Sequence, residues 1–367
     1  MSTSPDAPAL TDAQPPHDNQ LWTLTRRGWT VLLSGVLAVV FVLVGLLVPV
    51  PYVSLGPGPT YDTLGDVDGV PIVKVDGEQT YPTSGQLRMT TVSVDDDVSL
   101  FDALGKWVSG RYALAPREEY FRPGETEEQI EEQNTKLFQD SQSNAQVAAL
   151  RYLNYPMKVI AGQITAGAPA DKVLAPGDQL LEINGKPVAK AEDVRAALAG
   201  SRPGQTIGVR FTREGADKTA TITLGNATDY GVEARDEGFI GLGPTERPDV
   251  KFTTEITLED VGGPSAGLMF SLAIVDRLTP GGLGGDTTIA GTGEISTQGQ
   301  VGRISGIPFK MAAAHEEGAT TFLVPAGNCV EAKENAPDGL RLVKVETLRG
   351  AVKSLEDLQA GRDTPGC

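Results

Sequence analysis

The strongest hydrophobic pattern in the chain is one uncharged run near the N-terminus. It extends from Gly28 to Tyr61, and its apolar part, Thr30 to Val50, has about the 20 residues that a helix needs to cross a bilayer. We therefore predict a transmembrane helix over residues 29–50. A cleaved signal peptide is the alternative, but the run exceeds the usual h-region of roughly 7 to 15 residues, and no A-x-A-like site follows it.

Charges flanking this run predict its orientation. Arg26 and Arg27 precede it, whereas the next basic residue after it is Lys74. By the positive-inside rule, residues 1–28 form a cytoplasmic tail, and everything after the helix is extracytoplasmic. The tail is rich in Pro, Asp, Ala and Thr, so we predict that it is disordered. The predicted location is a single-pass protein of the cell membrane.

Residues 51–154 are predicted to be a linker followed by a small mixed segment. The string "PVPYVSLGPGPTYDTLG" is punctuated by Pro and Gly, which is typical of a linker. "PIVKV" and "QLRMTTVSV" alternate like strands, and Ser99 can cap a short helix. Thr126 and Gln129 fit a capping box at the start of a long acidic helix, whose charged side is either a solvated face or a docking surface.

Residues 155–228 alternate like a compact β-rich module. "MKVIAGQI" is strand-like, Asn184-Gly185 is a tight hairpin signal, and Glu214-Gly215 separates two alternating runs, "IGVRF" and "ATITL". Between the two turns, "KAEDVRAALAG" predicts a short helix ending at a glycine.

The string "AGAPADKVLAPGDQLLEINGKPV" resembles the PDZ family. The resemblance implies a groove between a strand containing Val159 and Ile160 and a helix containing Val194 and Leu198, where an extended peptide would add a strand. Where many PDZ domains carry a Gly-Leu-Gly-Phe-like carboxylate loop, this chain has "LNYPM", which departs from the pattern. A PDZ domain that only packs against its neighbour is the alternative.

Residues 239–358 alternate strands and helices, and the first transition carries a candidate nucleophile. "DVKFTTEITL" has the period of a strand and leads into "EDVGGPSAGLMFSLAIVDRLT", where Pro264 suits the first position of a helix. Ser265 would then lie in the first helical turn, whose free N–H groups can stabilise an oxyanion. An ordinary helix start is the alternative.

A nucleophilic serine needs a base, and the inventory of bases is short. The chain has only His17, in the predicted cytoplasmic tail, and His315, so a histidine triad is nearly excluded. "GRISGIPFKMAAAHEEGA" predicts a second helix that places Lys310 in its first turn. Burial beside the apolar residues of this helix and, to a smaller extent, the positive helix end would both lower the pKa of a lysine there. Ser-Lys pairs are a known variant of the serine triad. A solvated lysine is the alternative.

"GGPSAG", followed by "AGTGEISTQGQVGRISGIPFKMAAAHEEGA" and "FLVP", resembles the proteolytic domain of the Lon family. The order and spacing are especially similar to bacterial membrane-anchored PDZ-Lon-type proteins. The resemblance implies that Ser265 is the nucleophile and Lys310 the base, and Gly263 and Thr292 are the candidates for positioning this pair or the oxyanion. Gly262 stands where many Lon proteases carry an acidic residue.

Composition narrows the possible partners. A net charge of −17 argues against a phosphate-binding surface, so no nucleic acid partner is expected. No cofactor or metal ion is expected, because no Cys or His cluster has ligand spacing. The sequence contains no G-x-x-x-x-G-K-[ST] motif, so nothing suggests ATP-driven unfolding. Cys329 and Cys367, the latter in a C-terminal tail of residues 359–367, can form a disulfide in an oxidising compartment or remain free thiols.

The fold class predicted from these observations is α+β multidomain: a transmembrane helix, a β-rich PDZ domain and an α+β Lon-type proteolytic domain. The predicted function is a membrane-anchored, ATP-independent serine endopeptidase that cleaves protein or peptide substrates recruited by the PDZ domain. A PDZ adaptor with a non-catalytic Lon-like scaffold is the alternative. Because Lon-type domains often form rings, the resemblance leaves a monomer and a homo-oligomer both open.

Overall fold

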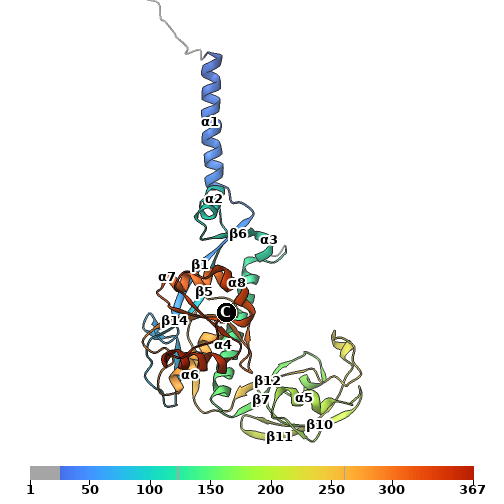
Figure 1. The fold of residues 1–367 in the computed structure, drawn as a ribbon. Coiled ribbons are helices and arrows are strands. Elements are labelled where there is room, and N and C mark those ends of the chain that lie inside the picture. The colour runs from blue at the N-terminus through green and yellow to red at the C-terminus, as the bar shows by residue number, and fades with distance from the viewer. Residues whose placement is uncertain (1–24, 122–123, 260) are drawn as a thin grey trace, which may run out of the picture.

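Residues 25–121, 124–259 and 261–367 are described by the computed structural model. Most of the predicted N-terminal tail, including His17, lies outside these residues. Helix α1 (Arg26–Leu47) projects away from the large domain and exposes most of its apolar side chains (Figure 1). Its 22 residues span about 33 Å, which is enough for the hydrocarbon core of a bilayer. The described residues therefore contain one candidate membrane span, which begins and ends three residues before the predicted bounds.

The large domain is built on a six-stranded sheet with the order β18-β17-β14-β5-β1-β6. Strands β5, β14, β17 and β18 are parallel, whereas β1 is antiparallel to both β5 and β6. The bounds are β1 (Tyr52–Asp62), β5 (Gln86–Asp95), β6 (Ala113–Pro116), β14 (Thr288–Gly291), β17 (Thr321–Pro325) and β18 (Arg341–Val345).

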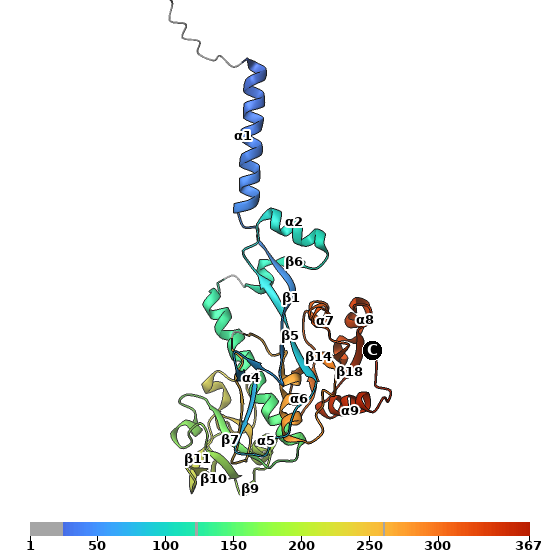
Figure 2. The same cartoon turned by 90° about the vertical axis from the view of Figure 1, so that its left-hand side faces the viewer.

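The predicted linker at the start of residues 51–154 is wrong, because most of it forms strand β1. Figure 2 shows β1 running from the end of α1 deep into the large domain, beside β5. Pro59 falls in the stretch where the pairing register with β5 shifts, and Pro57 lies beyond Leu55, the last residue of β1 that is paired with β6. Gly56 has no room for a side chain, since a Cβ there would lie 2.4 Å from the ring of Tyr112.

Helices cover both faces of this sheet. On one face, α4 (Glu127–Tyr152), α6 (Gly267–Leu278) and α9 (Leu348–Gln359) share a core with Leu87 and Leu323. On the other face, α7 (Ile307–Glu316) and α8 (Cys329–Asn335) pack against Phe322 and Val324. The alternation of side chains along β17 accounts for the two cores and gives a three-layer domain.

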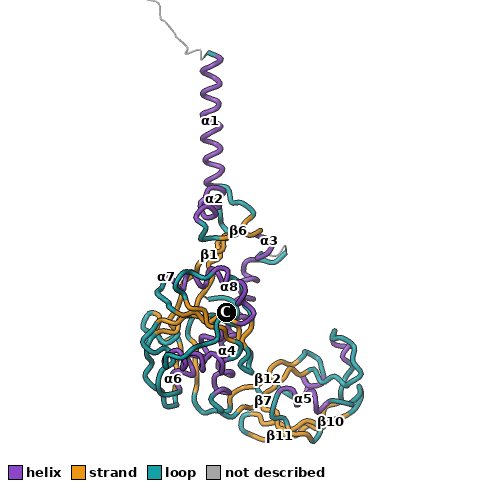
Figure 3. Tube along the Cα trace, in the orientation of Figure 1, coloured by secondary structure: helices purple, strands orange, loops and turns teal. Residues whose placement is uncertain are grey.

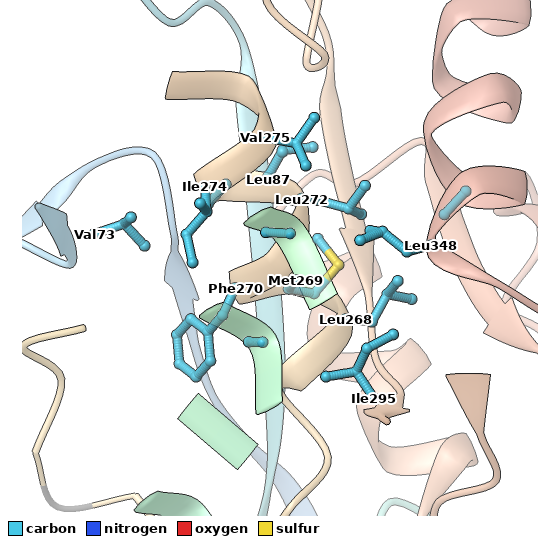
Figure 4. Close-up of a cluster of buried hydrophobic side chains, with 14 of the residues drawn as sticks. Val73, Leu87, Leu268, Met269, Phe270, Leu272, Ile274, Val275, Ile295 and Leu348 are labelled. Atoms are coloured by element: carbon cyan, nitrogen blue, oxygen red, sulfur yellow. The ribbon is translucent and has the colours of Figure 1, made fainter. Parts of the chain in front are cut away.

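The central helix α6 is buried on all sides rather than on one face. Only Arg277 among its residues is not fully buried. Figure 4 shows its side chains, among them Leu268 and Leu272, surrounded by Leu87, Ile295 and Leu348 from other elements. A helix enclosed in this way holds the loop before it in a fixed position.

The smaller β-rich domain is an insertion in the large one. It lies between α4 and β13 (Thr253–Ile256), which pairs with β4 (Val73–Asp76) of the large domain. Where the insertion begins and ends, the N–H of Asp249 donates to the carbonyl oxygen of Pro156 at 2.8 Å. Residues 51–154 are therefore not a separate unit, because their strands and α4 belong to the core of the large domain.

The inserted domain, which consists mainly of strands and loops in Figure 3, has a sheet of order β11-β10-β8-β7-β12, with β9 attached to β8. Its predicted turns are confirmed, since Asn184, Gly185, Glu214 and Gly215 all have positive φ. The sheet continues past the predicted end at residue 228, because β12 belongs to it and not to the large domain. The bounds are β7 (Met157–Ile164), β8 (Gln179–Ile183), β9 (Lys186–Pro187), α5 (Ala191–Leu198), β10 (Thr206–Arg213), β11 (Ala216–Thr223) and β12 (Leu242–Pro248).

Short elements complete the described part of the chain. The predicted caps are confirmed, because Ser99 accepts from the N–H of Asp102, and Thr126 forms the capping box with Gln129. In the structure, the sulfur atoms of Cys329 and Cys367 are joined in a disulfide. The remaining bounds are β2 (Asp66–Val67), β3 (Val70–Pro71), α2 (Leu100–Ser109), α3 (Arg117–Tyr120), η1 (Pro169–Lys172), η2 (Ala227–Tyr230), β15 (Glu294–Ile295), β16 (Val301–Gly302) and η3 (Ala326–Asn328).

Candidate active site

Ser265 lies in the loop that precedes α6, and not in its first turn as predicted. The helix begins at Gly267 with Ala266 as its N-cap residue, so Pro264 also lies outside the helix. Gly267 is required here, because a Cβ would come within 2.6 Å of the side chain of Ile295. The backbone N–H groups of Ser265 and Ala266 form no hydrogen bond within the described residues, so both donors remain free.

The loop carrying Ser265 is held by helix α4. The N–H of Gly263, a residue with φ of +84°, donates to the carbonyl oxygen of Asn134 at 3.1 Å. The hydroxyl of Ser141 donates to the carbonyl oxygen of Pro264 at 2.9 Å. Because the N–H of Gly263 is already bound, Gly263 shapes the loop in this arrangement and is not a free oxyanion donor. Sequence reasoning missed Asn134 and Ser141, which lie more than 120 residues before the loop.

Lys310 reaches the same loop from helix α7. It lies in the first turn, as predicted, after Gly306 at the N-cap and Pro308. Its Nζ lies 2.5 Å from the Oγ of Ser265 and 3.1 Å from the Oγ1 of Thr292. Only 3% of the lysine is exposed, and this burial lowers its pKa to about 8. The structure thus brings together a hydroxyl and an amine that is easily neutral.

Thr292 follows directly after β14 and orients both groups. Its hydroxyl donates to the carbonyl oxygen of Ser265 at 2.9 Å, and the N–H of Gly293 donates to the same oxygen at 2.8 Å. The hydroxyl also accepts from the Nζ of Lys310. Because Thr292 is 1% exposed, these contacts are shielded from water and fix Ser265 relative to Lys310.

A cleft of about 580 Å³ opens over Ser265 and Lys310. One wall comes from β1 and β5, with Leu55 and Val92 among its residues, and the other from the loop of Arg303 to Gly306. This second loop is fixed by Asn328, whose side chain bonds both the N–H and the carbonyl oxygen of Ile304. The cleft is large enough for several residues of an extended chain.

The predicted groove of the smaller domain is wrongly placed. Val159 and Ile160 lie on β7, which is paired on one side with β8 and on the other with β12. The sheet edge next to α5 is therefore β12, and the N–H of Ala191, at the start of α5, donates to the carboxylate of Glu246 on β12. Val194 and Leu198 do lie on α5, but they are buried in the core of the domain.

Residues 238–243, "GFIGLG", form the start of the edge strand β12, which begins at Leu242, and the loop before it. Sequence reasoning looked for a glycine-rich loop before β7 and found "LNYPM", whereas the strand next to α5 comes from the other end of the domain. The Gly-x-x-Gly-x-Gly spacing of residues 238–243 could have indicated this loop. The sequence analysis counted residues from 239 onward as part of the C-terminal domain, because the neighbour of a strand cannot be read from chain order.

Glu246 also links the two domains. Its carboxylate is 4% exposed and pairs with Arg151 at the end of α4, whose Nε donates to the carbonyl oxygen of Thr297 at 2.9 Å. Thr297 lies in the hairpin that follows Thr292 and Gly293 along the chain. The edge strand of the smaller domain is thus in contact with the segment that borders Ser265 and Lys310.

Comparisons with known proteins assign both domains. Residues 259–355 match the Lon protease (S16) C-terminal proteolytic domain, and residues 133–224 match the PDZ domain. The Lon protease of Shigella dysenteriae serotype 1 (strain Sd197) is 32% identical over 182 residues, which are 43% of this chain and 22% of that protein. The Lon protease of Buchnera aphidicola subsp. Schizaphis graminum (strain Sg) is 38% identical over 94 residues, 25% of this chain and 12% of that protein.

This chain therefore spans no more than 22% of the length of these two relatives. Among solved structures, the PDZ domain of the SdrC-like protein from Listeria monocytogenes is 19% identical. It covers 24% of this chain and 87% of that one, with a TM-score of 0.22.

Proposed function

Because this chain contains a PDZ domain and a Lon-type proteolytic domain, which support a serine protease, we propose that it is a membrane-anchored serine endopeptidase with Ser265 as nucleophile and Lys310 as base. The observation that carries the proposal is the contact between the two side chains in a cleft, with the pKa of the lysine lowered to about 8 by burial. The enzyme needs no ATP for hydrolysis, and its substrates are flexible extracytoplasmic or membrane-associated proteins.

The reaction is an acyl transfer through an ester of Ser265. The Oγ attacks the carbonyl carbon of the substrate while its proton passes to the neutral Nζ of Lys310. The resulting ammonium gives this proton to the leaving amine when the peptide bond breaks. Lys310, neutral again, then takes a proton from water as the water oxygen attacks the ester carbon. When the ester bond breaks, the ammonium of Lys310 returns this proton to the Oγ of Ser265, which regenerates the hydroxyl and releases the carboxylic acid.

The negative charge of the tetrahedral intermediate needs donors that are free before the reaction. The N–H groups of Ser265 and Ala266 meet this condition, and both residues line the cleft. They precede α6, so the positive end of its dipole adds to their effect. Removing one such donor from an oxyanion site typically costs about 10²- to 10³-fold in rate.

The PDZ domain supplies the substrate to this site. We place its peptide groove between the free edge of β12 and helix α5, with the loop of residues 238–243 at one end. A peptide that pairs with β12 would lie beside the strand that carries Glu246, whose ion pair with Arg151 joins this domain to the large domain. The groove therefore recruits substrates and takes no part in the chemistry.

The proposed activity is tested with the full-length protein in nanodiscs and an internally quenched, unstructured peptide. Hydrolysis without ATP is expected, and Ser265→Ala is expected to abolish it while leaving the circular dichroism spectrum unchanged. Peptide binding without hydrolysis by the parent protein would instead identify a PDZ adaptor with a non-catalytic scaffold.

The role of the PDZ domain is tested by deleting residues 157–248 and joining Pro156 to Asp249 with a Gly-Ser bridge. The hydrogen bond between these two residues shows that the ends are adjacent. The shortened protein should cleave short peptides at the parent rate but cleave a folded-domain substrate with a flexible tail more slowly. Loss of short-peptide cleavage in a folded deletion variant would make the domain structural.

A further inference from the structure

Helix α2 is packed against the C-terminal end of α1. The N–H of Val50, just after α1, donates to the carbonyl oxygen of Val98 at 2.8 Å, and Ser99 then caps α2. The ring of Phe101 lies edge-on to that of Phe41, with centroids 6.0 Å apart. It also covers Gly45, where a Cβ would come within 2.4 Å of the same ring. Figure 2 shows α2 directed away from α1 at its end, above the large domain.

One face of α2 is apolar and exposed. Leu104, Trp107 and Val108 are exposed by 52%, 66% and 75%, and Leu100 continues the same stripe one turn earlier. The charged residues of α2, Asp102 and Lys106, lie on the other side of the helix, where Lys106 pairs with both Asp102 and Asp95. Beneath the stripe, Val50, Tyr52 and Leu114 border a groove of about 250 Å³ that is lined entirely by apolar residues and Tyr52.

We infer that α2 lies in the surface of the bilayer that α1 spans, with its apolar face among the lipid chains. The inference rests on the proposed anchoring by α1. Lipid rather than another protein is the expected contact, because the apolar face of α2 is continuous with the membrane span. Phe101 contacts Phe41 within the span itself, six residues or about 9 Å before Leu47. The first turn of α2 is therefore already at the depth of the apolar band, and Trp107 suits its boundary.

The apolar face, rather than charge, drives this contact. Lys106 is the basic residue of α2, and it is engaged by two carboxylates. Binding of α2 should therefore be indifferent to anionic lipid and to salt, unlike that of a basic amphipathic helix.

This placement fixes the height of the catalytic cleft. Strand β1 starts at Tyr52 and reaches the cleft at Leu55 and Pro59. At about 3.3 Å per residue, the near wall of the cleft lies roughly 10 to 23 Å from the bilayer surface. Segments of substrate close to the membrane are therefore the ones within its reach.

The test uses single thiol probes on the full-length protein in phosphatidylcholine vesicles, labelled with bimane without reductant so that the disulfide stays closed. Leu104→Cys is the test site, and Asp102→Cys on the other side of α2 is the matched control. Val36→Cys, on α1 at a residue 51% exposed, reports the anchor, and Val232→Cys, at an exposed residue of the smaller domain away from the disulfide, reports the aqueous part of the protein. Quenching is measured with lipids that carry a nitroxide on the acyl chain.

We expect the probe at position 104 to be quenched several-fold more than that at 102, at any salt concentration and without anionic lipid. Quenching at position 36 but equal, weak quenching at 102 and 104 would overturn the inference while leaving the anchor intact. No quenching at position 36 would refute the anchor and, with it, the placement of α2. Crosslinking between two copies at position 104, with no lipid quenching there, would assign the face to a second copy instead.

Discussion

The pKa of Lys310 predicts how the rate of hydrolysis depends on pH, because only the neutral amine can accept the proton of Ser265. Burial lowers this pKa to about 8. The neutral fraction of the amine is then about 1% at pH 6, about 9% at pH 7 and about 91% at pH 9. We expect kcat/KM to rise nearly 10-fold between pH 6 and pH 7, about 90-fold by pH 9, and to level off there. If Lys310 were a solvated lysine with an ordinary pKa of about 10.4, kcat/KM would still rise tenfold per pH unit at pH 9.

The substitution that separates base from cation at this position is Lys310→Arg. A guanidinium stays protonated, so it retains the charge and loses the basic function. We expect a loss of about 10³-fold in kcat/KM, within the range for removing a general base. The assay is hydrolysis of the quenched peptide by full-length protein at constant ionic strength. Lys333→Arg, at an exposed lysine on α8, is the matched control and should leave the rate unchanged.

Two results would refute this reasoning. A rate that does not depend on a basic group between pH 6 and pH 9 would show that Lys310 does not exchange a proton with Ser265. More than a tenth of the parent turnover in a folded Lys310→Arg variant would make Lys310 a structural cation. Either result would leave the Lon-type fold intact and remove the proposed mechanism.

Three further predictions concern stability, topology and the disulfide. Lys310→Met should raise the free energy of unfolding by about 1 to 2 kcal/mol at pH 7: removing the buried ammonium gains about 3 kcal/mol, and two lost hydrogen bonds offset part of it. Because folding lowers the pKa of Lys310, the gain from removing the ammonium should be full below pH 8 and absent above pH 10.5. Urea titrations at several pH values measure this change in the free energy of unfolding. Protease added outside intact cells should remove both the PDZ and the peptidase epitopes, and full protection of both would reverse the orientation. Alkylation without reductant should label neither Cys329 nor Cys367, and reduction should lower stability by roughly 4 kcal/mol for a loop of 38 residues; two freely labelled thiols would contradict the pairing.

Local signals in the sequence predicted the parts of the fold that depend on local chemistry. The cap at Ser99, the turn at Asn184 and the first-turn position of Lys310 each follow from residues a few positions apart. The lowered pKa of Lys310 was also predictable from its place beside the apolar residues of its helix, with burial as its cause.

Long-range pairing could not be predicted in the same way. Strand β1 looks like a linker because it is rich in proline and glycine, and its pairing with β5, which includes a register shift between Pro57 and Thr60, cannot be read from the local sequence. Strand β12 was assigned to the wrong domain because its partner, β7, lies about 80 residues earlier in the chain. Asn134 and Ser141 carry no catalytic signature, and only the packing of α4 on α6 brings them to the nucleophile loop.

The central claim is that Ser265 is a nucleophile activated by Lys310. Its most direct test is intact mass spectrometry of the full-length protein after treatment with a fluorophosphonate, followed by peptide mapping of the adduct. The account predicts one phosphonyl group per chain, located on Ser265, formed faster at pH 9 than at pH 7 and absent from the Lys310→Arg variant. An adduct on another serine, or an equal rate of labelling in Lys310→Arg, would contradict it.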